Sequence, residues 1–188
     1  MAYDLITKAE YKTYAGISST NSDSEIAFLI PKVSDFVKTY CRRRFVEWVD
    51  DAKSEVFSGN YASFVLAETP VLSVSSVEYS QDYGQTWTAY TQYTDWVLDG
   101  DVVLPIGYTR WPKAIRGYRV TYTAGYETIP GDLKLAVLDL LMYYLKQNSA
   151  VHSSKAPGTN AVQIEYISTT SIPANIRRVL DQYVSDYS

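Results

Sequence analysis

The chain has 188 residues with 17 lysines and arginines against 21 aspartates and glutamates, so its formal net charge is −4. This length suits one domain with its own hydrophobic core, and the acidic balance disfavours a protein that binds free nucleic acid through a broad basic surface. A single cysteine excludes an internal disulfide, the opening residues lack the apolar run of a signal peptide, and no stretch of eighteen apolar residues occurs. We therefore expect a soluble protein of the reducing cytosol.

Two helices are predicted in the first quarter of the chain. A short one lies near residues 4–14, and a longer one should run from about 23 to 42, because its apolar residues recur at helical spacing. Pro31 lies inside the longer helix and should remove one backbone hydrogen bond and kink the axis. Ser22 and Glu25 fit the S-x-x-E pattern of a capping box at its start.

The end of the longer helix carries three arginines, Arg42, Arg43 and Arg44. Cations at a helix C-terminus are stabilised by the helix dipole. This structural role is the first interpretation, and a contact with phosphate or an acidic partner stays open as the second.

Between about residues 46 and 123 the hydrophobic period changes to two, and turn residues separate the short runs. This pattern predicts a small antiparallel β sheet or barrel. Asp99-Gly100 between two apolar runs indicates a hairpin with a type I′ turn, in which both central residues have φ > 0. Because helices are predicted on both sides, the block is interpreted as a β insertion in a helical framework, and the expected fold class is α+β.

The strongest local signal lies in residues 117–147, where a strand passes through a turn into an apolar helix. Gly125 breaks the strand, and Pro130 presets the first helical turn. One helix face comprises Leu133, Ala136, Val137, Leu140, Leu141 and Tyr144, and a second comprises Leu135, Leu138, Met142 and Leu145. A helix that is apolar nearly all round must be covered on more than one side. Two interpretations stay open, namely a core helix in a monomer and a helix whose second face packs on another subunit.

The last forty residues are predicted as a loop, a strand and a helix. Residues 148–160 are polar with a Pro-Gly step, which is typical of an exposed flexible loop. A short strand at 162–166 could pair at a sheet edge, including that of a neighbouring chain. Pro173 opens an amphipathic helix that either docks into a partner's groove or folds back on its own core. Its apolar face comprises Ile176, Val179, Leu180, Tyr183, Val184 and Tyr187.

Residues that could carry chemistry are sparse. The only histidine, His152, falls in the predicted loop, so neither a catalytic triad nor a histidine-bearing metal site is expected. Cys41 lies on an apolar helix face, where a small buried side chain is a better interpretation than a nucleophile. We expect no enzyme, cofactor or metal site. A sugar-stacking strip stays open as an alternative, in which a monomeric β-rich module binds carbohydrate through Trp87, Tyr90, Tyr93 and Trp96.

Four segments, in their order and spacing, carry a family resemblance: FLIPKVSDFVKTYCRRRF, TPVLSVSSVEYSQDYG, YTDWVLDGDVVL and YRVTYTAGYETIPGDLKLAVLDLLMYYLKQ. Over residues 24–147 the chain resembles the head-tail connector (adaptor, or head-completion) proteins of tailed bacteriophages. Pro31 departs from the small helix-forming residue that such proteins usually carry there. After residue 148 the chain resembles the family only in its general type of segment.

The resemblance implies a single connector domain, residues 1–188, that assembles as a homo-oligomeric ring with the twelvefold symmetry of the portal. The ring would attach beneath the portal after DNA packaging, extend the DNA channel and offer a platform to a downstream neck or tail protein. DNA would pass through without sequence-specific binding, and no membrane would be involved. The resemblance places the protein in the virion, at the head-tail interface, after assembly in the cytoplasm of the bacterial host.

The resemblance also assigns two sets of residues. A C-terminal docking segment, residues 148–188, would reach into the portal, and its binding residues would be Ile176, Arg177, Arg178, Leu180, Tyr183 and Tyr187. A ring needs two different faces on each subunit. The expected subunit-interface residues are Leu135, Leu138, Met142, Leu145, Val162, Ile164 and Tyr166.

Overall fold

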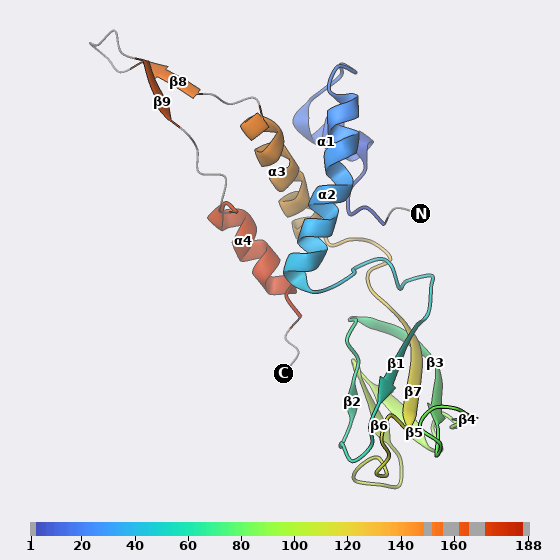
Figure 1. Ribbon diagram of the computed structural model, residues 1–188. Coiled ribbons are helices and arrows are strands. Elements are labelled where there is room, and N and C mark those ends of the chain that lie inside the picture. Colours follow the sequence, from blue (N-terminus) through green and yellow to red (C-terminus); the bar gives the residue numbers. More distant parts are fainter. Residues whose placement is uncertain (1–2, 149–151, 156–161, 166–171, 186–188) are drawn as a thin grey trace. The chain divides into compact units, whose positions relative to one another are not determined.

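The computed structural model describes residues 3–148, 152–155, 162–165 and 172–185. The chain divides into two compact units, a helical unit of Met1–Arg42 with Pro130–Val184, and a β unit of Arg43–Ile129 with Ser185–Ser188 (Figure 1). In sequence, the β unit is inserted between the second and third helices. The predicted α+β fold, a helical framework with inserted antiparallel strands, is therefore confirmed.

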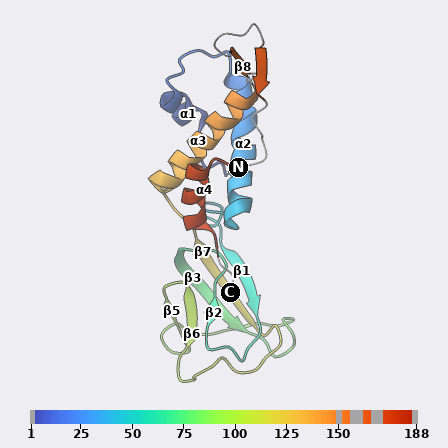
Figure 2. The same ribbon diagram turned by 90° about the vertical axis from the view of Figure 1, so that its left-hand side faces the viewer.

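The helical unit is built from four α-helices and one 3₁₀ turn among its described residues. They are α1 (Lys8–Ala15), α2 (Asp23–Cys41), α3 (Gly131–Asn148), α4 (Ala174–Leu180) and η1 (Asp181–Tyr183). Both views show α2, α3 and α4 side by side (Figures 1 and 2). The predicted longer helix and the helix after Pro130 are confirmed to within a residue or two at each end.

The first predicted face of α3 forms the centre of the helical core. Leu133, Val137, Leu140 and Leu141 are fully buried, and Ala136 is nearly so. They pack in one unit with buried residues of the neighbouring helices, among them Ile26, Ile30, Val33 and Val37 of α2. Burying each large apolar side chain stabilises the fold by about 1.5–3 kcal/mol, so this face accounts for much of the stability of the helical unit.

The capping box lies on α1 and not on α2. The Thr7 hydroxyl accepts a hydrogen bond from the Glu10 amide at 3.2 Å, and the Glu10 carboxylate accepts one from the Thr7 amide at 2.8 Å. Ser22 makes no cap hydrogen bond, because its backbone (φ −99°, ψ 6°) lies outside the extended region that an N-cap needs. The Ser22–Glu25 prediction was therefore wrong, although α2 does begin at Asp23.

A strand hairpin lies within the C-terminal part of the chain. The backbone of β8 (His152–Lys155) pairs antiparallel with β9 (Val162–Glu165). The strand expected near residues 162–166 is confirmed up to Glu165, but the prediction of a loop at 148–160 was wrong for His152–Lys155. The segment HSSK is polar at every position, so no period-two pattern marks it as a strand.

The β unit contains two antiparallel sheets. The first has the strand order β1-β7-β3-β4 and the second β2-β6-β5. The strands are β1 (Lys53–Phe57), β2 (Phe64–Val65), β3 (Val71–Tyr79), β4 (Thr88–Ala89), β5 (Trp96–Asp99), β6 (Val102–Pro105) and β7 (Tyr118–Ala124). The long strand β7 lies between β1 and β3, so the strand that precedes α3 is one of the two inner strands of its sheet.

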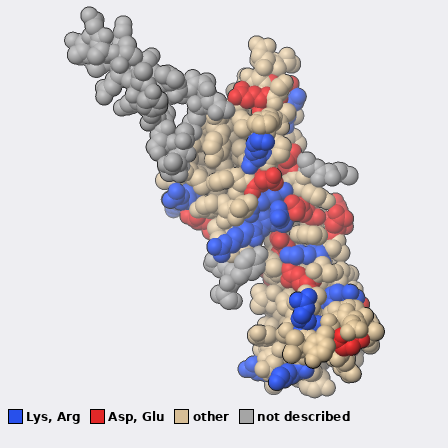
Figure 3. Space-filling model, viewed as in Figure 1, with Lys and Arg blue, Asp and Glu red and all other residues tan. Residues whose placement is uncertain are grey.

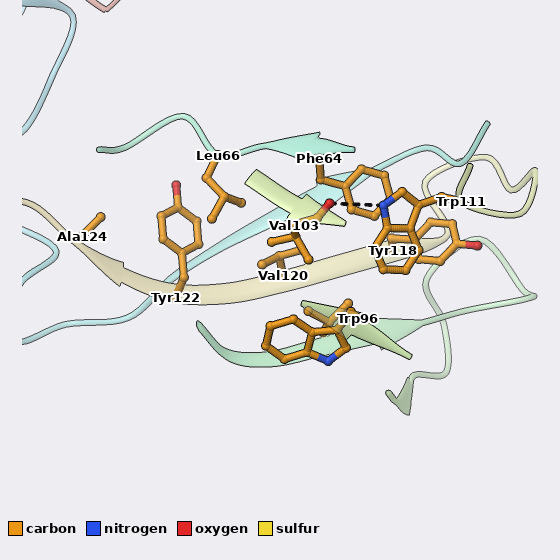
Figure 4. Packing of buried hydrophobic residues seen from close by; sticks show 10 residues of the cluster. Phe64, Leu66, Trp96, Val103, Trp111, Tyr118, Val120, Tyr122 and Ala124 are labelled. Atoms are coloured by element: carbon orange, nitrogen blue, oxygen red, sulfur yellow. Dashed lines mark hydrogen bonds between the residues drawn. The ribbon is translucent and has the colours of Figure 1, made fainter. Parts of the chain in front are cut away.

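The core of the β unit is rich in aromatic side chains from both sheets (Figure 4). Along β7, Tyr118, Val120, Tyr122 and Ala124 are buried while the residues between them are not, as the period-two pattern predicts. Phe64 stacks on Trp111 with ring centroids 4.5 Å apart, and the indole Nε1 of Trp111 donates to the Val103 carbonyl at 3.3 Å. This core thus accounts for part of the high aromatic content of the chain.

The hairpin between β5 and β6 is confirmed, but its turn type differs from the prediction. Asp99 pairs with Val102, so the central residues are Gly100 and Asp101, one position later than expected. Gly100 has φ +59°, and Asp101 does not have positive φ, which is the pattern of a type II′ turn. The Asp101 carboxylate also accepts a hydrogen bond from the Val71 amide at 2.8 Å, which joins the hairpin to β3.

Candidate interaction surfaces

The second face of α3 is only partly covered by its own chain. Leu138 is 8% exposed and belongs to the helical core, whereas Leu135 is 47% exposed. Met142 and Leu145 are half-buried and line a groove of about 670 Å³. The structure thus brings Met142 and Leu145 together at one open surface and places Leu138 mainly inside the fold.

The groove is closed on its other side by α1 and the start of α2. Its further lining residues are Tyr11, Ala15, Ile17, Ser22, Glu25, Ile26 and Lys146. Two hydrogen bonds hold α1 to α3, from Tyr14 to Asp139 at 2.6 Å and from Lys134 to Glu10 at 2.7 Å. The contribution of α1 was missed from sequence, because these partners are about 125 residues apart and no local pattern links them.

The residues expected to bind the portal lie in two environments. Ile176 and Leu180 are buried against the helices of their own unit, where the Cys41 thiol donates to the Leu180 carbonyl at 3.6 Å. Arg177 and Arg178 are exposed, and Tyr183 is half-buried. Tyr187 lies outside the described residues. In this structure α4 therefore adopts the second of the two expected states, in which the helix folds back on its own core.

Tyrosine–aspartate hydrogen bonds fix the C-terminal helix to its neighbours. The Tyr40 hydroxyl donates to Asp181 at 2.5 Å, which joins α2 to η1, and the Tyr183 hydroxyl donates to Asp132 at 2.6 Å, which joins η1 to α3. The Tyr183 bond holds the pKa of the Asp132 carboxyl below its ordinary value, whereas the Asp181 carboxylate raises the pKa of Tyr40. Both bonds are hence strongest when aspartate is ionised and tyrosine is protonated.

The remaining interface residues lie in the C-terminal hairpin. Val162 and Ile164 lie in β9, and Tyr166 lies outside the described residues. β9 pairs with β8 of the same chain. Its assignment to a subunit interface stays a prediction.

The four aromatic residues considered for sugar stacking do not form a common strip. Trp96 is buried in the β core, Tyr90 stacks on Tyr79, and the guanidinium of Arg119 lies 4.5 Å from the Trp87 ring centre. Only Tyr93 is widely exposed. The arrangement supports the aromatic-core interpretation over a carbohydrate-binding module.

The described residues include few candidates for a catalytic or metal-binding site. Cys41 is buried, as expected of a small packing residue. Within the described ranges, no group of three or more His, Cys, Asp and Glu side chains could hold a metal ion. None of the described helices combines the length and apolarity that a membrane crossing requires.

The described residues form a fold of the α+β class with an open apolar groove, exposed basic groups and exposed aromatic groups, all of which are available to partner proteins. The chain belongs to the Head completion protein family, whose model matches residues 4–185. As a head completion protein it is a structural head-tail adaptor.

Three solved structures with this fold are of gene transfer agent (GTA) particles. Chains from "Neck of empty GTA particle computed with C6 symmetry" and "Virion of native gene transfer agent (GTA) particle" each match with 14% identity and a TM-score of 0.62, over 98% of this chain and 91% of theirs. A chain from "Neck of native GTA particle computed with C12 symmetry" matches with 14% identity and a TM-score of 0.60, over 96% and 88%. At this identity the likeness establishes the fold. No curated protein matches the chain.

Proposed function

We propose that the protein assembles as a homo-oligomeric ring of twelve subunits beneath the portal at the head-tail interface of the virion. In this role it extends the DNA channel, which DNA crosses without sequence-specific contacts, and supports the downstream neck or tail protein. The whole chain acts as one connector domain and assembles in the cytoplasm of the bacterial host. The sixfold and twelvefold symmetries of the GTA necks that share the fold support a ring.

The observation that carries the ring proposal is the apolar groove between α1, α2 and the C-terminal half of α3. A ring is built from heterologous contacts, so each subunit must offer two different faces that fit one another, and the groove could be one of them. Met142 and Leu145 are half-buried in the groove, and their remaining apolar surface is removed from water when a neighbouring subunit covers it. The exposed Leu135 extends the same second face of α3.

The ring interface can be tested at Met142. Met142→Asp places a carboxylate in the groove and should abolish rings, since an unpaired charge in a buried contact costs several kcal/mol. The measurement is native mass spectrometry with negative-stain imaging, with and without purified portal, because connectors can stay monomeric until they meet the portal.

The matched control is Met142→Leu, which keeps the apolar character and roughly the volume and should assemble as the wild type does. Circular dichroism of both variants separates lost assembly from lost folding. Intact rings from folded Met142→Asp would show that the groove faces solvent in the assembly. Leu138→Asp is a poorer test, because Leu138 is buried within its own subunit.

We further propose that α4 meets the portal through its exposed cations first. Arg177 and Arg178 are free to approach acidic portal groups while the helix is docked. The apolar anchors Ile176 and Leu180, with Tyr183, reach a partner only after α4 leaves α2 and α3. Tyr187 completes this anchoring face.

Reversing the two exposed charges tests this contact without disturbing the core. The double variant Arg177→Glu/Arg178→Glu should stay folded and bind purified portal about tenfold or more weakly, with the loss mainly in the association rate. Arg177→Lys/Arg178→Lys is the control, since it keeps both charges. Unchanged portal binding by the glutamate variant, measured by surface plasmon resonance, would contradict a role for these arginines.

A further inference from the structure

One segment of the β unit has a charge opposite to its surroundings. Residues 43–129 contain 7 basic and 11 acidic residues, yet residues 102–126 contain four basic residues and no acidic one. Arg119 is paired with Glu78 at 2.6 Å. The other three, Arg110, Lys113 and Arg116, are exposed, and none of them forms an ion pair with a described acidic residue. Basic groups are visible at the lower end of the β unit in Figure 3.

These cations lie on a loop that is joined to two others by backbone hydrogen bonds. The Gly59 amide donates to the Ala114 carbonyl at 2.7 Å, and the Ser80 amide donates to the Gly117 carbonyl at 2.8 Å. The approach at Gly59 is so close that an added Cβ would lie 1.8 Å from the Pro112 carbonyl oxygen. The three loops therefore form one ordered surface, which lowers the entropy cost of binding a partner.

Exposed aromatic and apolar side chains accompany the cations on this surface. Tyr83 is 71% and Ile115 is 62% exposed, and both border a hollow of about 340 Å³ with Tyr79 and Lys113. Tyr61 is also exposed, and its carbonyl accepts a hydrogen bond from the Trp111 amide, next to Arg110. We use the name cationic loop face for Tyr61, Tyr83, Arg110, Lys113, Ile115 and Arg116.

We infer that the cationic loop face binds an acidic segment of a partner protein, with carboxylates on the three cations and an apolar side chain in the hollow beside Tyr83 and Ile115. Charge complementarity selects the acidic segment, because the three cations have no acidic partner within the described chain. Tyrosine and arginine are the residues enriched at energetically important positions of protein interfaces.

Nucleic acid is the competing ligand, and the composition disfavours it. Binding to a duplex depends on neutralising many phosphates, whereas this face offers three cations on an acidic unit. The exposed Ile115 and the hollow have no role in a contact with phosphates. The cationic loop face shares no residue with the α3 groove or with α4. The inference can therefore be tested independently of the proposed ring and portal contacts.

The test uses the full chain and a labelled synthetic peptide of glutamates around one central phenylalanine. Fluorescence anisotropy at low ionic strength should show saturable binding that weakens with added salt. Arg110→Glu/Lys113→Glu/Arg116→Glu should weaken binding about tenfold or more. The control Lys8→Glu/Lys32→Glu reverses two exposed cations of the helical unit and should bind as the wild type does, whereas Arg110→Glu/Lys113→Glu, with the same change in net charge, should bind the peptide several-fold more weakly.

A comparison of two peptides tests whether an apolar side chain binds in the hollow. A peptide with serine in place of phenylalanine should bind the wild type several-fold more weakly, and Tyr83→Ala/Ile115→Ser should remove that difference between the peptides. Equal binding by Lys8→Glu/Lys32→Glu and Arg110→Glu/Lys113→Glu would overturn the inference. So would tighter binding of a DNA duplex that depends on the same three cations, because the face would then be a nucleic-acid surface.

Discussion

The carboxylate of Asp82 organises the loop that carries Tyr83. It accepts hydrogen bonds from the Thr86 hydroxyl at 2.6 Å, the Ser80 hydroxyl at 2.7 Å, and the amides of Thr86 and Gln85 at 2.8 and 3.0 Å. These donors, with the Thr86 hydroxyl first, hold the pKa of the Asp82 carboxyl well below its ordinary value of 3.8. The ionised form therefore maintains one border of the cationic loop face.

This depressed pKa predicts a pH dependence of stability. The stabilising contribution of Asp82 is complete above the ordinary carboxyl pKa and is lost as the pH falls from there toward the lower folded pKa. Asp82→Asn removes the titration, so its free energy of unfolding should fall less steeply than that of the wild type below about pH 4. Urea denaturation across the acid range measures both curves. Parallel curves would mean that the carboxylate is not favoured in the folded loop.

Predictions for single residues were correct where a local sequence pattern is compatible with only one structure. The alternation along 118–124 fixes which residues of β7 face the core, and the structure follows it. The capping pattern lies at the start of two helices, at Thr7–Glu10 and Ser22–Glu25, and only the first forms a capping box. At the second, Asp23 is held by Lys8 and Lys12, a tertiary arrangement that the local pattern does not contain.

At the scale of elements, the turn between β7 and α3 needs a glycine. Gly125 has φ +115°, and an added Cβ would lie 2.3 Å from the Phe45 carbonyl oxygen. Gly125→Ala should thus destabilise the protein by about 1–3 kcal/mol, through an unfavourable backbone conformation and the clash. Thermal unfolding measures the loss.

The control for this substitution is Gly131→Ala at the start of α3. Gly131 has no positive φ, and an added Cβ would meet nothing within 4 Å. Since alanine favours helix more than glycine does, Gly131→Ala should be neutral or slightly stabilising. If the two variants unfolded at the same temperature, the turn would tolerate a side chain at position 125.

Helices and strands were predicted best where their signals follow one another along the chain. They were predicted least well where segments distant in sequence come together. The strand, turn and helix of residues 117–147 could be predicted because each signal follows the last along the chain. The hairpin strand β8 could not, since its residues are all polar. The docked state of α4 was one of two open alternatives, because an amphipathic pattern does not say which surface covers it. Its docking also means that a stop at Ser171 would remove the core residues Ile176 and Leu180 together with the exposed arginines.

At the scale of the whole molecule, three surfaces are proposed to contact partners of this head-tail adaptor. The apolar groove, the exposed arginines of α4 and the cationic loop face lie on different segments of the chain. The family resemblance could be read from the order of degenerate apolar segments. The cationic loop face was missed, although the lack of acidic residues in 102–126 was a signal for it.

The division of the chain into two units also separates its spectroscopic signals. All four tryptophans, Trp48, Trp87, Trp96 and Trp111, lie between residues 43 and 129, whereas every described α-helix lies outside that range. Tryptophan fluorescence accordingly reports the β unit, and far-ultraviolet circular dichroism is dominated by the helical unit. If the chain is one connector domain, both signals should change at the same urea concentration, whereas separate midpoints would show two independently folding units. The untagged wild-type protein thus carries a built-in reporter for each half, with which the site of action of any variant or partner can be assigned.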